Sequence, residues 1–193
     1  MPTSPRSLTF TLTLVVCASV APALQAQMPA AAGMPGMGQH PGHPVAAAAS
    51  RDSTRAFLRM MVDHHQGLIV MGDSASARAT RAATKADAHK LRDEQATEQR
   101  RMETMLHRTY GVDSVQPTVI PSNQAMLDTL GHASGAEYDR MFYRFVIAHH
   151  REALAMIDQA LPHLTPEVRG MAAGMRAKQQ REIAQLERKM RAA

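Results

Sequence analysis

The strongest constraint on how this 193-residue chain can fold is an internal repeat. The segment FLRMMVDHHQGLIVM at 57–71 aligns with FYRFVIAHHREALAM at 142–156, at an offset of 85 residues. Further along, LRDEQATE at 91–98 aligns with MRAKQQRE at 175–182, at an offset of 84. Each copy carries His-His in its first segment and Gln-x-x-Glu in its second. Because repeated units bury their apolar faces on one another, we expect the two copies to pack as a pseudo-symmetric pair.

Apolar residues in both copies recur at intervals of three, four and seven, which is typical of amphipathic helices. Ser50 is expected to cap a first helix that stops near Gly72, and the segment from Ser134 to Glu137 matches a capping box. Gly111 should end the second helix, and Pro166 suits the first position of the last one. We predict helices at about 50–72, 80–110, 123–130, 134–162 and 166–193.

These helices, with almost no strand signal, predict an all-α fold. The four long helices would form a four-helix bundle over residues 51–193. The bundle would be built from two repeated helical hairpins, at about 51–110 and 122–193.

Residues 1–26 have the three parts of a secretory signal peptide. One positive charge precedes an apolar run, and small residues then lead to a cleavage site expected after Ala26. The apolar run is shorter than the roughly 18 residues that span a bilayer, so we expect no stable membrane insertion after cleavage. The chain's one cysteine, Cys17, would leave with the signal peptide. The protein is therefore predicted to be periplasmic or secreted, without a thiolate to offer a metal.

Residues 27–50 are predicted to form a flexible tail, because they carry no charge and are rich in proline and glycine. Within the tail, Met34, Met37, His40 and His43 each lie three residues from the next. One interpretation is a linker of unremarkable function. The other is a flexible tether whose thioethers and imidazoles collect soft or borderline metal ions.

Composition narrows the classes of function. The formal charge of +5 arises from basic and acidic residues that are mixed along the chain, so we expect no nucleic-acid partner. The chain has 15 methionines and 10 histidines, and its methionines outnumber its aromatic residues. This abundance of thioethers and imidazoles favours metal ions as partners.

The first His-His pair is surrounded by methionines along the sequence. Met60 and Met61 lie four residues before His64 and His65, a spacing at which two side chains of a helix can contact one ion. Met71 follows further along the same segment. The structural alternative is that one histidine of the pair is a core residue and the other a surface residue.

The second pair, His149 and His150, has only Met156 in an equivalent place. Two repeated pairs close to four methionines favour a metal site over the structural alternative. Imidazole nitrogen suits Cu(II), and thioether sulfur suits Cu(I). Copper in one or both oxidation states is therefore the expected ligand.

Gln95 and Glu98 in the first copy, like Gln179 and Glu182 in the second, fall on otherwise apolar helical faces. Buried polar groups need partners, because an unpaired one is costly. Two interpretations remain open. These residues could bond the helices to one another, or the glutamates could accept the distal N–H of a metal-binding histidine.

The doubled patterns F-x-x-x-M/V-x-x-HH and Q-x-x-E resemble a bacterial family of duplicated, ferritin-like bundles known only as a domain of unknown function. The resemblance covers roughly residues 52–190. It implies a periplasmic or secreted four-helix bundle that binds copper through histidine and methionine. The second copy departs from the pattern, because Phe145 and Val146 replace the methionines before its His-His pair.

The leading functional hypothesis is an exported copper-binding protein, not an enzyme, that buffers or carries copper. A second copy of the chain and copper donor or acceptor proteins are its expected protein partners. One alternative is a ferritin-like di-metal oxidase, although such enzymes use Glu-x-x-His motifs, which this sequence lacks. The other is a structural or pH-responsive bundle, in which protonated histidines loosen a helix interface.

Overall fold

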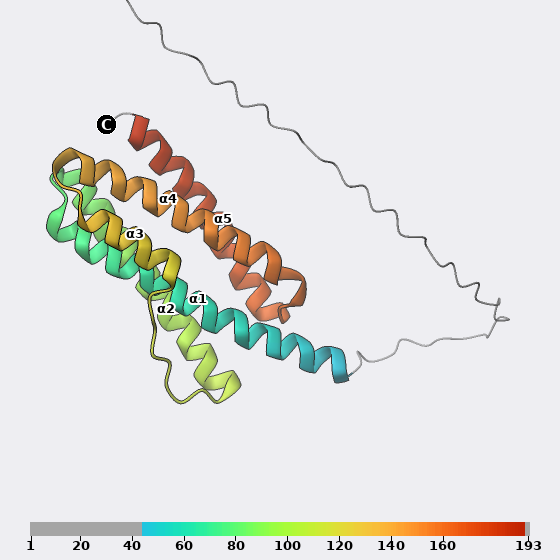
Figure 1. Ribbon diagram of the computed structural model, residues 1–193. Coiled ribbons are helices and arrows are strands. Elements are labelled where there is room, and N and C mark those ends of the chain that lie inside the picture. Colours follow the sequence, from blue (N-terminus) through green and yellow to red (C-terminus); the bar gives the residue numbers. More distant parts are fainter. Residues whose placement is uncertain (1–43, 192–193) are drawn as a thin grey trace, which may run out of the picture. The chain divides into compact units, whose positions relative to one another are not determined.

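The computed structural model describes residues 44–191, which form five α-helices and one short 3-10 helix (Figure 1). The elements are α1 (Pro44–Arg78), α2 (Ala82–Tyr110), α3 (Pro121–Gly131), α4 (Gly135–Ala160), η1 (Leu161–His163) and α5 (Pro166–Arg191). No strand occurs within these residues. The predicted all-α fold is confirmed, including the short third helix.

The long helices pair into two hairpins, α1 with α2 and α4 with α5. The connections within the hairpins are short, so the helices of each pair run antiparallel. The hairpins meet through α1 and α4, and α3 lies against both of these helices (Figure 1). The two His-His motifs therefore lie on the two helices that join the repeats.

The turn of each hairpin is held by the first helix of the other copy. Asp139 on α4 accepts hydrogen bonds from the backbone N–H groups of Thr80 and Arg81, both at 2.9 Å. At the related position on α1, Thr54 Oγ1 accepts a hydrogen bond from the backbone N–H of Thr165, also at 2.9 Å. Both pairs of equivalent residues are 85 positions apart in the sequence. The repeat thus extends to the contacts that fix the turns.

Helix α1 is longer at both ends than the sequence predicts. It begins at Pro44, so residues 44–50 of the expected tail are helical, and Ser50 lies inside the helix instead of capping it. The helix also passes through Gly72, where α2 approaches closely: a Cβ atom at Gly72 would lie 2.7 Å from the Cβ of Arg92. Gly72 therefore serves helix packing and does not end the helix. The predicted signal peptide and residues 27–43 lie outside the described residues.

The other helix ends mostly follow the prediction. Gly111 follows α2 in the left-handed region with φ 65°, and Pro166 is the first residue of α5. The predicted capping box is wrong, because the Ser134 side chain makes no capping hydrogen bond. Gly135 has φ 58°, so the backbone at the start of α4 departs from the regular helix that a capping box with Glu137 requires.

The core consists of two apolar clusters separated along α1 and α4 by buried polar residues. One cluster includes Leu68, Met71, Ala75, Tyr138, Phe142 and Val146. The other includes Phe57, Leu58, Met61, Met102, Ile157 and Val168. The histidine pairs lie between these clusters in the sequence of both helices, so the centre of the bundle is polar.

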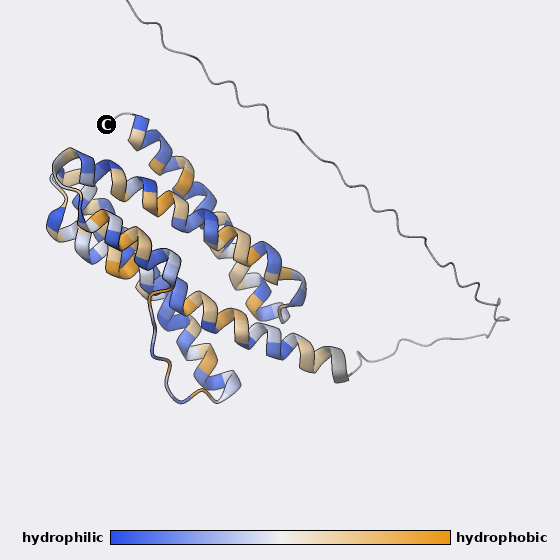
Figure 2. Cartoon of the chain, in the orientation of Figure 1, coloured by the Kyte–Doolittle hydropathy of each residue, from blue (hydrophilic) through white to orange (hydrophobic). Residues whose placement is uncertain are grey.

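The helices of the bundle are amphipathic. Figure 2 shows hydrophilic and hydrophobic residues along each of them. Among residues 44–191, none of the helices combines the length and the hydropathy needed to cross a bilayer.

Candidate metal centre

All four histidines of the two repeated pairs are buried, with no exposed surface. The rings of His64 and His149 stack, with centroids 3.9 Å apart and an interplanar angle of 27°. His65 lies beside His64 with ring centroids 6.4 Å apart, and His150 lies beside His149 at 5.8 Å. The structural alternative, in which one histidine of each pair is a surface residue, is wrong for both pairs.

The bundle buries both members of a pair because consecutive helical residues point about 100° apart. On α1, His64 faces the His149 ring of α4, and His65 faces Glu98 of α2. On α4, His150 faces Glu182 of α5. Each His-His motif therefore contacts two neighbouring helices at once.

Of the two open interpretations of Glu98 and Glu182, the structure shows the one in which each glutamate contacts a histidine. His65 Nε2 donates a hydrogen bond to Glu98 Oε2 at 3.1 Å, and His150 Nε2 lies 3.0 Å from Glu182 Oε2. A carboxylate beside Nε2 favours the tautomer in which that nitrogen carries the proton. The Nδ1 atoms of His65 and His150 are then left with a lone pair.

Glu98 is held as a carboxylate by its two partners. Burial by itself would raise its pKa, but hydrogen bonds from His65 and Lys178 outweigh burial and hold the pKa of Glu98 below its usual value. Lys178 Nζ lies 2.9 Å from Glu98 Oε1 and 3.3 Å from Glu94 Oε2. This lysine links α5 to α2 beside the histidine cluster.

Asn123 of α3 fixes the stacked pair from the other side. Its amide nitrogen donates a hydrogen bond to the backbone carbonyl of His64 at 3.2 Å. The amide oxygen must therefore accept, and it lies 3.2 Å from His149 Nδ1. Nδ1 of His149 carries the proton, and Nε2 has the lone pair.

Gly67 makes the approach of Asn123 possible. A Cβ atom at position 67 would overlap the side-chain amide of Asn123 and lie 2.6 Å from its Cβ. Only a residue without a side chain leaves room for Asn123 between α1 and α4.

Glu152 supplies a third carboxylate, directed at His64 with Nε2 and Oε2 3.6 Å apart. Ser122 of α3 donates a hydrogen bond to Glu152 Oε1 at 2.9 Å. The nearby imidazole of His64 lowers the pKa of Glu152, against the opposing effect of burial. This contact orients one ring of the stacked pair.

The stacked imidazoles are neutral at pH 7. Burial lowers the pKa of His64 despite the contact with Glu152, and it holds the pKa of His149 well below 6.5. Repulsion from the neighbouring imidazoles lowers the pKa of His149 further. Neutral imidazole is the form that binds metal ions.

Every histidine in the cluster has at least one buried ring nitrogen without a hydrogen-bond partner among the described residues. Away from the carboxylates these atoms are Nδ1 of His64, His65 and His150, and Nε2 of His149. The Nε2 atoms of His64 and His150 also lack a hydrogen bond, although each lies near a glutamate. The amides of Gln95 and Gln179, one turn before the two glutamates, also hold unpaired buried atoms. Unpaired buried polar atoms are costly unless a further partner binds them. The donor set therefore fits a metal that prefers imidazole nitrogen.

The histidines do not form a closed metal site as they stand. Within residues 44–191, no group of three His, Cys, Asp or Glu side chains is arranged to hold a metal ion. Metal binding at the cluster would require the rings to turn toward a common point.

The structure separates the predicted methionines from the histidine cluster. Met61 and Met71 are fully buried, each in a different apolar cluster, and act as core residues there. Met60 is 40% exposed, and Met156 is half-buried on the outer surface. The tail residues predicted as ligands, Met34, Met37, His40 and His43, lie outside the described residues.

Sequence reasoning missed Asn123, Glu152 and Gly67. The repeat that revealed the histidines could not reveal Glu152, because Gly67 stands at the equivalent position of the first copy. The two equivalent positions therefore have different roles. Gly67 leaves room for Asn123, and Glu152 contacts His64. A search for residues at which the two copies differ would have found both.

A family model described as "Domain of unknown function (DUF305)" matches two segments, residues 16–106 and 113–190. The chain belongs to the DUF305 family. Each matched segment contains one of the two His-His pairs. A comparison with curated proteins found no match.

Solved structures of DUF305 proteins share the fold. A DUF305 fragment from Deinococcus radiodurans is 23% identical, with a TM-score of 0.65, over 73% of this chain and 97% of that one. CopM in its Cu(II)-bound form is 26% identical, with a TM-score of 0.62, over 72% of this chain and 96% of CopM. CopM in its Cu(I)-bound form has the same identity and coverage, with a TM-score of 0.61.

Proposed function

We propose that this DUF305 protein binds copper at the buried histidine cluster and acts as an exported copper buffer or carrier. The observation that carries the proposal is that each of the four buried histidines has a ring nitrogen that lies away from the carboxylates and has no hydrogen-bond partner among the described residues. His64, His65, His149 and His150 would hold the metal through these atoms. Support also comes from CopM, which is similar to this chain and whose structures hold Cu(I) and Cu(II).

The carboxylates support a binding role rather than an enzymatic one. Glu98 and Glu182 contact the Nε2 atoms of His65 and His150, and Glu152 contacts His64. In this position they orient the imidazoles and raise their basicity, as hydrogen-bonded carboxylates do behind many metal-binding histidines. A di-metal oxidase uses its carboxylates as metal ligands, so the observed contacts favour the copper buffer.

The test is the copper content of protein prepared without a histidine tag, measured together with Cu(I) binding in competition with a chromophoric chelator. We expect the His64→Gln/His149→Gln variant to lose at least one tightly bound Cu(I) per chain. His89→Gln is the matched control, because His89 is an exposed histidine of α2. Copper binding that is equal in the double variant, the control and the wild-type protein would contradict the proposal.

A further inference from the structure

A surface groove of about 290 Å³ brings together Met60, Met156 and His163. It lies between α1 and the corner where α4 passes into η1. Met60 is 40% exposed and is, among the described residues, the one large hydrophobic side chain that is exposed. The two methionines thus line the same groove as an exposed histidine.

The fold of the bundle does not depend on this groove, because the equivalent place in the second copy is filled by side chains. Residue Ser53 in its wall corresponds to Tyr138 in the second copy, 85 positions later, and Met60 corresponds to Phe145. Tyr138 is fully buried, and Phe145 packs against the apolar cluster. Aromatic side chains thus fill the equivalent place in the other half of the molecule, where Met71 is fully buried.

The walls of the groove contain soft donors and no formal charge. Two thioethers and one imidazole are present, and none of the lining residues is Asp, Glu, Lys, Arg or Cys. Thioether sulfur binds soft cations such as Cu(I), whereas Mg²⁺ and Ca²⁺ require oxygen ligands. The backbone beside the imidazole is fixed, because Ser50 Oγ donates a hydrogen bond to the carbonyl oxygen of His163 at 3.1 Å.

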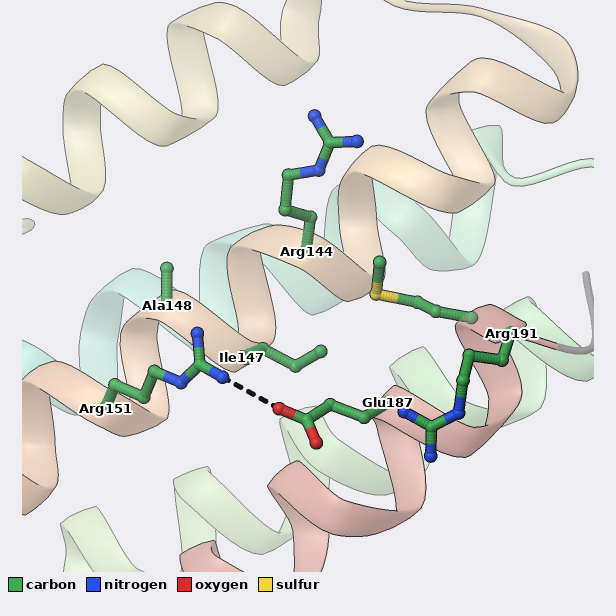
Figure 3. Close-up of a pocket in the computed structure, with 7 residues that line it drawn as sticks. Arg144, Ile147, Ala148, Arg151, Glu187 and Arg191 are labelled. Atoms are coloured by element: carbon green, nitrogen blue, oxygen red, sulfur yellow. Dashed lines mark hydrogen bonds and ion pairs between the residues drawn. The ribbon is translucent and has the colours of Figure 1, made fainter.

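A second groove also contains a methionine, but charged side chains surround it. It lies between α4 and α5 and is lined by Arg144, Arg151, Glu187, Met190 and Arg191 (Figure 3). It offers one thioether, and three arginines line it against one glutamate, which is paired with Arg151 at 2.7 Å. Such a groove repels a cation, so Met190 is a suitable control residue.

We propose that Met60, Met156 and His163 form a solvent-facing site for a monovalent soft cation, Cu(I) or its analogue Ag(I), separate from the histidine cluster. The choice of copper rests on the proposed function. Met60 lies one helical turn before His64, and Met156 lies one turn after Glu152, which contacts His64. The site therefore lies one helical turn along α1 and α4 from residues of the buried cluster, and it holds the metal where a donor protein or solvent can reach it.

The experiment is a titration of the full exported chain with Ag(I), followed by NMR of methionine methyl groups labelled with ¹³C. We expect the Met60 and Met156 signals to shift together and to saturate with one bound ion. The Met60→Leu/Met156→Leu variant, which nearly conserves volume, should bind one Ag(I) fewer than wild type. His163→Ala should weaken binding at this site at least tenfold, and Met190→Leu should change nothing.

The His64→Gln/His149→Gln variant distinguishes this proposal from copper binding at the cluster. If the groove is a separate site, the Met60 and Met156 signals shift in that variant as they do in wild type. If the shifts disappear there, the methionines depend on the cluster and the proposal is wrong. Methionine signals that never move, or an unchanged number of bound ions in the double leucine variant, would also overturn it.

Discussion

The metal-free protein is expected to lose stability steeply as the pH falls from about 6.5 toward 4. Burial holds the pKa of His64 and His149 below 6.5 in the folded protein, while both imidazoles titrate near 6.5 in the unfolded chain. Below pH 6.5 the unfolded state therefore binds more protons than the folded state, and the free energy of unfolding decreases.

Two carboxylates add to this loss at lower pH. Glu98 and Glu152 have folded-state pKa values below 4.5, so their stabilising contribution is present above pH 4.5 and lost below it. Protonating one ring of the stacked pair at pH 5 would place a charge against a second imidazole in a buried site. Uncompensated buried charges cost about 3–5 kcal/mol, which sets the size of the expected effect.

Urea denaturation followed by circular dichroism at a series of pH values measures this dependence. The His64→Gln/His149→Gln variant, whose amides do not titrate, should have a much flatter profile between pH 6.5 and 4.5. His89→Gln removes an exposed histidine and should keep the wild-type slope. Equal slopes in the double variant and in wild type would show that the buried imidazoles do not control stability in acid.

The Gly67→Ala variant is expected to destabilise the bundle by about 1–3 kcal/mol from overpacking alone. The new methyl group would overlap Asn123, which contacts both His64 and His149. Displacing Asn123 removes the acceptor from His149 Nδ1, so Cu(I) affinity should fall together with stability. The measurements are chemical denaturation and chelator competition on the same samples.

Gly170→Ala is the matched control for this substitution. Gly170 lies on α5 with no atom within 4 Å of the position of an added Cβ. Alanine there should be neutral or stabilising by up to about 1 kcal/mol, because glycine is a poor helix former. If Gly67→Ala is as stable as Gly170→Ala and binds Cu(I) normally, Asn123 does not control the stacked pair.

The sequence was sufficient to predict the features that repeat. The offset of 85 residues predicted two hairpins, and the His-His and Gln-x-x-Glu motifs predicted which residues would meet at the centre. The contacts of His65 with Glu98 and of His150 with Glu182 follow this pattern. Repetition is informative here because equivalent helices must present equivalent faces to one another.

The features that break the repeat were not predictable in this way. Met61 lies one helical turn before His65 in the sequence, yet it packs in the apolar cluster with Phe57 and Leu58. Periodicity places a residue on a helix but does not decide which neighbouring helix its side chain faces. Glycine disfavours helices, so the sequence predicts a helix end at Gly72, whereas the close packing of Arg92 of α2 against this glycine outweighs that preference.

The most direct test of copper binding at the buried cluster is ¹⁵N NMR of the imidazole nitrogens, recorded before and after saturation with Ag(I). We expect the unpaired nitrogens, Nδ1 of His65 and His150 first among them, to shift from lone-pair to metal-bound values. The Nε2 atoms that face Glu98 and Glu182 should keep their protons. Unchanged nitrogen signals from all four buried histidines, with shifts only in exposed ones such as His89, would contradict metal binding at the buried cluster.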